Sequence, residues 1–437
     1  MRRLILIITL LLIFIPGCDI PQQPTWEETP PSPLPSATQT AQAEPTTTES
    51  PTSPPPSPTS PPPTQPMDTS TPAPDRTSLP PLTKGLEVEI TRIHMVTKTK
   101  GWAIGHQGTS HDHILYTQDG GRTWLDHTPP TTTLQNADQK IQAKGFFLDE
   151  NHAWVKYFIQ APPPPLQAQF VWRTTDAGVN WQISQPLPLT GKEMYFTPTA
   201  FDFIDSSRGW LLVNIDAGMN HEYSNLYTTQ DGGDSWDRIL DPTGTGLQVA
   251  SNTELLFANE NEGWVTKDAP VIAKGPFIEK TTDGGYSWDT LFLPSPENLD
   301  FEDPDLFCKT YSPAFTSKQT RLLLLSCKDS EKEGTTQYVY ATSDEGENWR
   351  YTELPSPVSE LVFIDYQTGY ALGRDIYKTE NGGEDWEKIK TVYWDGQFSF
   401  VDEENGWAVV RKEGKIGFVY TRDGAQLFQL LDPIISP

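Results

Sequence analysis

One eight-residue phrase occurs seven times between residues 117 and 428, twice in altered form, and this repeat limits the folds open to the chain. The first copy reads Thr117-Gln-Asp119-Gly-Gly121-Arg-Thr-Trp124. An Asp side chain accepts hydrogen bonds from the amides that follow it, and Gly adopts the positive φ of a tight turn. We therefore expect each copy, called here a box turn, to form a hairpin turn with its ring packed back over it. The acid and ring positions are, in chain order, Asp119 and Trp124, Asp176 and Trp181, Asp231 and Trp236, Asp283 and Trp288, Asp344 and Trp349, Asn381 and Trp386, and Asp423 and Phe428.

A second motif precedes nearly every box turn. It is an apolar run, then an acidic turn, then a Gly-aromatic pair, as in Phe203 to Gly209-Trp210 and in Phe400 to Gly406-Trp407. Short β-branched and aromatic runs flank both motifs, so each unit is expected to contain four antiparallel strands. Seven such units within residues 85–437 average about 50 residues each, which is typical of propeller blades. The sequence predicts an all-β protein, a seven-bladed β-propeller with box-turn hairpins.

Two other all-β architectures are weaker alternatives. A two-sheet sandwich gives no reason to repeat one turn seven times, and the turns of a parallel β-solenoid are shorter. Eleven of the fourteen tryptophans occupy the two repeat positions. We interpret them as packing between blades.

The first seventeen residues have the pattern of a bacterial lipoprotein signal peptide. Met1-Arg2-Arg3 is a positive start, and residues 4–15 form an apolar run too short to span a membrane comfortably. The sequence Ile15-Pro-Gly-Cys18 then matches a lipobox, which would leave Cys18 as the lipidated N-terminus. An ordinary exported cysteine is the alternative. We expect a protein held by lipid at the outer face of the cytoplasmic membrane.

Residues 18–84 are expected to form a disordered stalk. The segment from residue 21 contains twenty of the forty-one prolines, interleaved with Ser and Thr, and has few large apolar residues. Such a composition favours extended polyproline II over a packed core. The predicted organisation is therefore a signal peptide at 1–17, a stalk at 18–84 and the propeller at 85–437.

Charge and cysteine content restrict the partners of the propeller. The net charge of −26 and the lack of clustered Lys and Arg make a nucleic acid partner improbable. A protein or peptide partner is expected, and a carbohydrate partner remains open. Cys308 and Cys327 both fall in the fifth unit, in a compartment where disulfides persist, so we expect a disulfide, with two free buried thiols as the alternative.

The candidate binding face is the rim opposite the box turns, where the loops vary in length. It carries His106, His111, His113, His221 and Tyr223. The spacing of these imidazoles matches no established metal site, and we expect neither a metal nor another cofactor. Solvated loop residues are the alternative interpretation of this cluster.

Two resemblances follow from these motifs. The phrase running from Thr117 to Trp386 is identified as the Asp-box, or bacterial neuraminidase repeat, which in sialidases and related propellers is a structural hairpin away from the active centre. The run from Phe400 to Ala408, with its counterparts, resembles the photosystem II assembly and stability factor propellers over residues 90–430. Photosynthetic members of that family are described as presenting an arginine patch to their partner, whereas the arginines here are scattered along the sequence.

The sequence contains no recognisable catalytic constellation, so our main functional expectation is a membrane-tethered, non-catalytic scaffold that binds or assembles proteins. The alternative is an Asp-box glycoside hydrolase, sialidase-like or xyloglucanase-like. A sialidase resemblance would require an arginine cluster and a Tyr–Glu pair. Only Arg92, within Thr91-Arg-Ile-His94, is similar to a motif of that family, and we interpret Arg92 as a strand residue.

Overall fold

The computed structural model describes residues 78–437 apart from 109–110, 132–139, 160–167, 218–221, 241–246, 248–252, 267–274, 316–319 and 332. The predicted signal peptide, Cys18 and the stalk up to residue 77 lie outside the described residues. The described part contains no helix long and apolar enough to cross a membrane.

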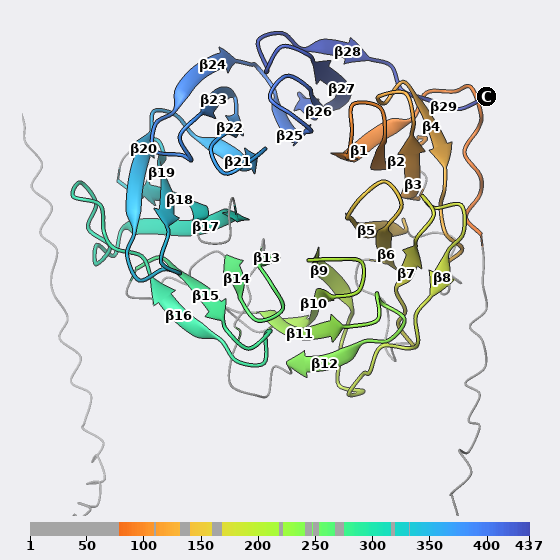
Figure 1. Ribbon diagram of the computed structural model, residues 1–437, viewed down its shortest axis with the longest axis horizontal. Helices are drawn as coiled ribbons and strands as arrows, with labels where there is room; N and C mark the ends of the chain where they lie inside the picture. Colours follow the sequence, from red (N-terminus) through yellow and green to blue (C-terminus); the bar gives the residue numbers. More distant parts are fainter. Residues whose placement is uncertain are drawn as a thin grey trace, which may run out of the picture. The chain divides into compact units, whose positions relative to one another are not determined.

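Seven antiparallel sheets are arranged around a central axis, which confirms the predicted seven-bladed propeller (Figure 1). Strands within each sheet follow one another in chain order from the axis outward. Blades 1 to 3 comprise β1 (Glu89–Met95), β2 (Gly101–His106), β3 (His113–Thr117) and β4 (Thr123–Asp126); β5 (Gln142–Phe147), β6 (Ala153–Phe158), β7 (Trp172–Thr174) and β8 (Gln182–Ile183); β9 (Thr197–Phe203), β10 (Gly209–Ala217), β11 (Glu222–Thr229) and β12 (Asp237–Leu240).

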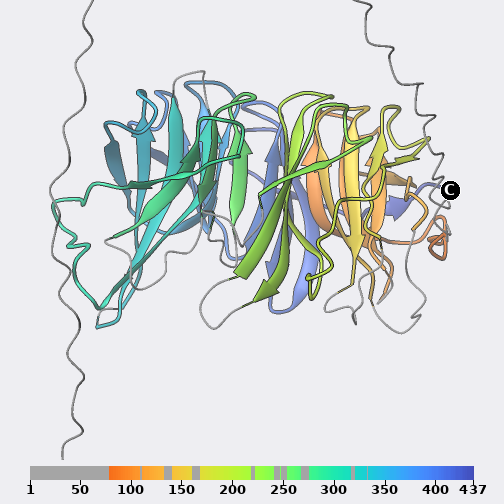
Figure 2. The ribbon, with the colours of Figure 1, turned by 90° about the horizontal axis from the view of Figure 1, so that it is seen from below.

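The remaining blades have the same order. Blades 4 to 7 comprise β13 (Glu254–Phe257), β14 (Gly263–Thr266), β15 (Phe277–Thr281) and β16 (Asp289–Phe292); β17 (Leu306–Phe315), β18 (Arg321–Asp329), β19 (Thr336–Thr342) and β20 (Arg350–Leu354); β21 (Val358–Phe363), β22 (Gly369–Gly373), β23 (Asp375–Thr379) and β24 (Glu387–Thr391); β25 (Asp395–Phe400), β26 (Gly406–Lys412), β27 (Lys415–Thr421) and β28 (Gln429–Leu431). A further strand, β29 (Ile434–Ile435), follows at the C-terminus. Seen edge-on, the strands run between two rims that carry the turns and loops (Figure 2).

The box turn is a closed set of short hydrogen bonds. In blade 1, the Thr117 hydroxyl donates to Asp119 Oδ1 at 3.0 Å and accepts the Gly121 N–H at 3.0 Å. Asp119 Oδ1 also accepts the N–H groups of Arg122 and Thr123, at 3.0 and 2.9 Å. Burial opposes ionisation of Asp119, but these hydrogen bonds outweigh it and lower its pKa. The turn therefore needs the hydroxyl and a side-chain oxygen acceptor, which in blade 6 is the amide oxygen of Asn381, 2.9 Å from Thr379 Oγ1.

Three box turns keep this shape without glycine at a left-handed position. Ala177, Glu345 and Ala425 have φ angles of 62°, 61° and 70°. The left-handed conformation costs about 1–2 kcal/mol for a residue with a Cβ. The Ala425 N–H nevertheless donates to Thr421 Oγ1 at 3.1 Å, as in the intact copies. The hydrogen bonds of the turn therefore persist even where the repeat has lost a glycine.

One aromatic side chain on the second strand joins each of several blades to the next. In blade 3, the Trp210 ring lies against Phe257 of blade 4, with centroids 3.6 Å apart and planes 3° apart. Its indole N–H donates to the carbonyl of Gly284, in the box turn of blade 4, at 2.9 Å. The same stacking recurs at three other junctions, between Trp102 and Phe147, Trp154 and Phe203, and Tyr370 and Phe400. The two repeated motifs thus meet at the blade junctions.

The glycine of the Gly-Trp pair is required by close packing within its own blade. A Cβ on Gly209 would lie 2.3 Å from Phe203 Cδ1, and one on Gly369 would lie 2.6 Å from Phe363 Cδ1. These distances are too short for carbon atoms, so the phenylalanine would have to move. For Phe203, that movement would also disturb the stacking on Trp154 of the preceding blade.

The C-terminus closes the ring on blade 1. β29 pairs in parallel with β4, with Ile434 opposite Thr123 and Ile435 opposite Trp124. Ile435 is buried in a core that includes Trp407 and Phe418 of blade 7. The C-terminal segment therefore contributes to the seam between the first and last blades.

The segment before β1 is bonded to the same C-terminal residues. The backbone hydrogen bonds run from Val88 N–H to Pro433 O at 2.9 Å, from Ile435 N–H to Leu86 O at 3.0 Å, and from Gly85 N–H to Ile435 O at 2.8 Å. Both the segment before β1 and the C-terminal segment therefore take part in closing the ring, and we call this pairing the terminal clasp.

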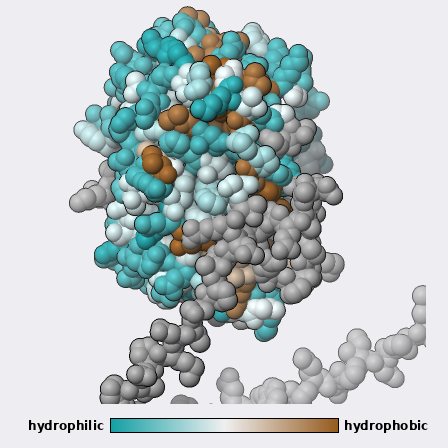
Figure 3. Space-filling model, turned by 90° about the vertical axis from the view of Figure 1, so that its right-hand side faces the viewer, coloured by the Kyte–Doolittle hydropathy of each residue, from teal (hydrophilic) through white to brown (hydrophobic). Residues whose placement is uncertain are grey.

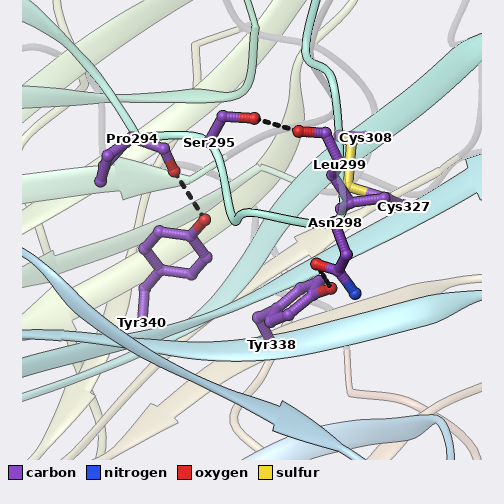
Figure 4. Close-up of a disulfide and its surroundings, with 8 residues drawn as sticks. All are labelled: Pro294, Ser295, Asn298, Leu299, Cys308, Cys327, Tyr338 and Tyr340. Atoms are coloured by element: carbon purple, nitrogen blue, oxygen red, sulfur yellow. Dashed lines mark hydrogen bonds between the residues drawn. A yellow bond between two sulfur atoms is a disulfide. The ribbon is translucent and has the colours of Figure 1, made fainter.

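Blade 5 contains a disulfide between Cys308 and Cys327 (Figure 4). The two residues are direct partners in the β17–β18 ladder, with Cα atoms 4.1 Å apart. Cys308 lies inside β17, which begins at Leu306. Nearby, Tyr338 donates its hydroxyl to Asn298 at 2.7 Å (Figure 4).

The surface shown in Figure 3 is mainly hydrophilic, and its hydrophobic atoms form small, separate patches. This is the surface expected of a strongly acidic protein with a net charge of −26.

We predict that Trp210→Phe lowers the free energy of unfolding by roughly 1–3 kcal/mol, because the buried Gly284 carbonyl loses its donor and the joint loses volume. Urea unfolding of the wild type and the variant measures this difference. The matched control is Trp394→Phe, since Trp394 is half-buried and its ring contacts Phe398 and Phe428 of blade 7. An equal loss in both variants would contradict a special role for the joint.

We also predict that deleting residues 433–437 destabilises the propeller by roughly 2–5 kcal/mol, because the clasp hydrogen bonds and the burial of Ile435 are lost together. Differential scanning calorimetry should show a lower Tm than for the full chain. Removing Pro437 alone is the control and should leave the Tm unchanged. A full-length Tm for the longer deletion would mean that the clasp does not hold the seam.

Candidate functional site

The register of the seven sheets places one residue from each innermost strand at the same height along the axis. The reference is the residue paired with the Gly of the Gly-Trp motif, for example Met95 opposite Gly101. The residue three positions before this reference is charged in four blades: Arg92 on β1, Lys144 on β5, Glu254 on β13 and Glu360 on β21. We call these four residues the axial quartet. The corresponding residue on β25 is the uncharged Gln397.

Strand alternation directs the quartet away from the cores between blades. The residues next to Arg92 and Glu254, Ile93 and Leu255, are buried, whereas Arg92 and Glu254 are exposed. Lys144 and Glu360 are half-buried. Solvent therefore reaches charged side chains on the innermost strands of four blades.

The carboxyl group of Glu360 has an unusual protonation equilibrium. Burial raises its pKa from 4.5 to about 7, and the negative charge of Glu254 adds to this effect. The Phe398 N–H, which donates to Glu360 Oε2 at 3.2 Å, and the charge of Arg92 act in the opposite direction. At neutral pH a large fraction of Glu360 is therefore protonated and able to give up a proton.

The two cations of the quartet also influence each other. Burial and, to a smaller extent, the charge of Arg92 lower the pKa of Lys144 to about 8, against the opposing effect of Glu254. Burial lowers the pKa of Arg92 as well, followed by repulsion from Arg411. Among the described residues, neither Arg92 nor Lys144 has a carboxylate within ion-pair distance. Their side chains are available to an anionic or strongly polar ligand.

This set of side chains is suited to acid–base chemistry on a polar substrate. Glu360 is partly protonated near neutral pH, and Glu254 supplies a second, solvent-exposed carboxylate. Two carboxyl groups in different environments can act as proton donor and as nucleophile or base. The described residues contain no group of three or more His, Cys, Asp or Glu side chains arranged to hold a metal ion.

The predicted binding-face histidines lie around blade 1. His106, at the end of β2, is buried, with Nε2 3.5 Å from Glu89 Oε1. His111 Nδ1 accepts the Ile141 N–H at 3.1 Å. His113 is buried at the start of β3.

A hydrogen bond to the end of β4 accounts for the position of His113. His113 Nδ1 lies 3.1 Å from Asp126 Oδ2. Asp112, between the two histidines, is close enough to the quartet to raise the pKa of Arg92. Tyr223 lies on β11 of blade 3, and His221 is outside the described residues. A role for these residues in binding stays a prediction.

The comparisons with known proteins identify the fold and no family. No protein-family model matches the chain, and no curated protein matches it. The chain is similar to a solved structure of a prolyl endopeptidase, at 9% identity and a TM-score of 0.50, covering 80% of this chain and 50% of that one. At this identity the likeness shows a shared fold alone.

Two further solved structures are named as carbohydrate-active enzymes. An ancestral GH74 enzyme has 15% identity and a TM-score of 0.49, covering 82% of this chain and 48% of that one. An α-L-arabinanase from Penicillium chrysogenum, complexed with arabinobiose, has 14% identity and a TM-score of 0.43, covering 66% and 94%. The chain spans about half the length of the endopeptidase and of the GH74 enzyme.

Sequence reasoning placed Arg92 in a strand but did not find the quartet. Its members come from four blades, so no local motif joins them. The quartet can be found in the sequence only after the seven units are aligned on the Gly-Trp pair. In four of the seven units, the residue three positions before the strand partner of that Gly is then charged.

We predict that Glu360→Gln increases stability above pH 7. A carboxyl group whose pKa is raised in the folded state stabilises the fold fully below its ordinary pKa of 4.5, and this contribution is lost as the pH rises through about 7. A neutral amide avoids that loss and can still accept the Phe398 N–H. At pH 8 the variant should be more stable by on the order of 1–3 kcal/mol.

Urea unfolding of both proteins at pH 4.5 and pH 8 measures this effect. Asp202, whose pKa burial also raises to about 7, is present in both proteins and cancels in the comparison. The same pH dependence in both proteins would show that Glu360 is not held protonated.

Proposed function

We propose that this protein is a glycoside hydrolase whose catalytic centre is the axial quartet. The observation that carries the proposal is Glu360, a half-buried residue whose carboxyl pKa is raised to about 7 by burial and by the charge of Glu254. Glycoside hydrolysis requires a proton donor of raised pKa and a second carboxylate.

In the proposed reaction, protonated Glu360 gives its proton to the glycosidic oxygen as the bond from that oxygen to the anomeric carbon breaks. The bonding electrons leave with the alcohol product. Glu254 stabilises the positive charge that develops on the sugar, either by bonding to the anomeric carbon or by taking a proton from the attacking water. Water supplies the new hydroxyl group, and Glu360 regains its proton by the end of the cycle.

Arg92 and Lys144 are assigned to substrate positioning. Both are at the height of the carboxyl groups, and no carboxylate of the described residues neutralises either one. Arginine offers several donors in a fixed plane, and a lysine ammonium donates three hydrogen bonds. Sugar hydroxyl and carboxylate oxygens fit these donors. Gln397 is a poorer candidate, because its amide already bonds to the Ile93 N–H and carbonyl of β1.

The proposal includes the location inferred from the sequence. A lipid on Cys18 and the stalk at 18–84 would hold the propeller outside the cytoplasmic membrane, where extracellular glycans are accessible. This part of the proposal is independent of the quartet. Metabolic labelling with a radioactive fatty acid, compared with a Cys18→Ser variant, tests it.

One observation favours a second candidate, the non-catalytic scaffold. The Glu360 carboxyl accepts a backbone N–H from the neighbouring inner strand, as Gln397 does from Ile93, so its role could be purely structural. The propeller would then resemble the photosystem II assembly factor-like proteins and hold a protein or peptide partner. The two candidates differ in whether glycans are turned over.

The test is hydrolysis of a panel of oligosaccharides and polysaccharides by the mature chain, followed by release of reducing ends. We predict that Glu360→Gln and Glu254→Gln each reduce turnover by about 10²–10⁴-fold. Glu387→Gln is the matched control, because Glu387 is exposed on the outer strand β24. Loss in both quartet variants, with full activity in the control, supports the hydrolase.

Turnover that survives both substitutions would place the activity elsewhere and reject the quartet as its centre. No turnover across the panel, combined with recovery of one defined protein partner by cross-linking from native membranes, would establish the scaffold instead. The unfolding measurements at pH 8 show separately whether each variant is folded.

A further inference from the structure

A small cavity of about 290 Å³ lies where the last blade meets the first. Its basic lining residues come from three separate turns: Lys98 from the β1–β2 turn, Arg122 from the box turn of blade 1, and Arg422 from the box turn of blade 7. Tyr420, on β27, forms another part of the wall. The cavity is therefore on the box-turn rim, whereas the axial quartet lies on the inner strands.

Two guanidinium groups approach the same aromatic ring. The central carbon of Arg422 lies 5.2 Å from the centroid of the Tyr420 ring, and that of Arg122 lies 6.0 Å from it. An aromatic face attracts a cation. The ring thus brings together two positive charges that are 300 positions apart in the sequence.

Little in the surroundings neutralises these charges. Arg122 Nη1 donates to the backbone carbonyl of Asp119 at 2.9 Å, which is a neutral acceptor. Lys98 pairs with Asp402 at 3.0 Å, but both side chains are substantially exposed, and such pairs are weak. In the described part of the chain, neither arginine has a carboxylate within ion-pair distance. No acidic residue lines the cavity.

The arrangement is unusual for this protein. The chain has 58 acidic and 32 basic residues, so an exposed arginine would readily find an acidic neighbour. Arg374, for example, is held by Asp395 at 2.9 and 3.0 Å. Two unneutralised guanidinium groups and an ammonium around one cavity therefore form a local positive site on an acidic molecule.

We propose that this cavity binds a tetrahedral oxyanion group, a sulfate or a phosphate. A guanidinium group offers parallel N–H donors that match two oxygens of such a group, and ionised partners strengthen these bonds. The cavity is large enough for the oxyanion together with a few attached atoms. The free ion and a sulfate ester on a sugar share this chemistry. The proposal does not depend on the hydrolase function.

Isothermal titration calorimetry of the mature chain, at low ionic strength, tests the site with two ligands, sodium sulfate and a monosulfated disaccharide. We expect both to bind with 1:1 stoichiometry. In the double variant Arg122→Gln/Arg422→Gln the affinity should fall about tenfold or more, since two charge-assisted contacts are lost. Arg374→Gln removes one positive charge elsewhere and is the control for a general charge effect.

Tyr420→Phe keeps the ring that holds the arginines and should retain binding, whereas Tyr420→Leu should weaken it. A disaccharide that binds more tightly than the free ion would assign the site to a sulfated glycan, and equal affinities would assign it to the free oxyanion. Absence of binding by the wild type, or equal binding by the double variant, would overturn the proposal. Thermal unfolding of each variant confirms that it is folded.

Discussion

The structure depends on a repeated contact in which an aromatic ring of one blade packs against the next blade. The ring packs on a phenylalanine at the end of the neighbouring inner strand, and its indole N–H satisfies a carbonyl in the neighbouring box turn, as Trp210 does with Phe257 and Gly284. Stacking alone would permit sliding, and the hydrogen bond fixes the height of one blade against the next. The two sequence motifs thus form the two sides of one contact, because the Gly-aromatic motif supplies the ring and the next box turn supplies the carbonyl. The joint at the seam follows this rule, since the Trp407 N–H donates to the Gly120 carbonyl at 2.9 Å.

A fixed height between blades has a direct consequence at the axis. Innermost strands are sheet edges with unpaired N–H groups, which proteins usually cover. Here a side chain from the preceding blade often does so: Gln397 accepts the Ile93 N–H, Ser399 the Met95 N–H, and Glu360 the Phe398 N–H. Because all blades share one register, the same positions also form a ring around the axis. A side chain at such a position can either cover the edge of a neighbouring strand or contact a ligand at the axis. The axial quartet occupies these positions.

The sequence predicted the architecture well because the blades pack with the same residue types at the same positions. The box turns, the four-stranded units and the seven blades follow from local chemistry that repeats. The axial quartet does not repeat. Arg92, Lys144, Glu254 and Glu360 differ from blade to blade, and their proximity arises only after ring closure. The same is true of Arg122 and Arg422, which looked scattered in the sequence and meet on one tyrosine ring.

The terminal clasp has a mechanical consequence. Residues 85–88 are bonded to the C-terminal segment, and that segment is bonded in turn to β4. Tension that arrives at residue 85 from the N-terminal side is therefore shared among several hydrogen bonds before it reaches β1. The load passes into the outer edge of blade 1 and the far end of the chain together. The two ends of the chain therefore resist a pull on residue 85 as one unit.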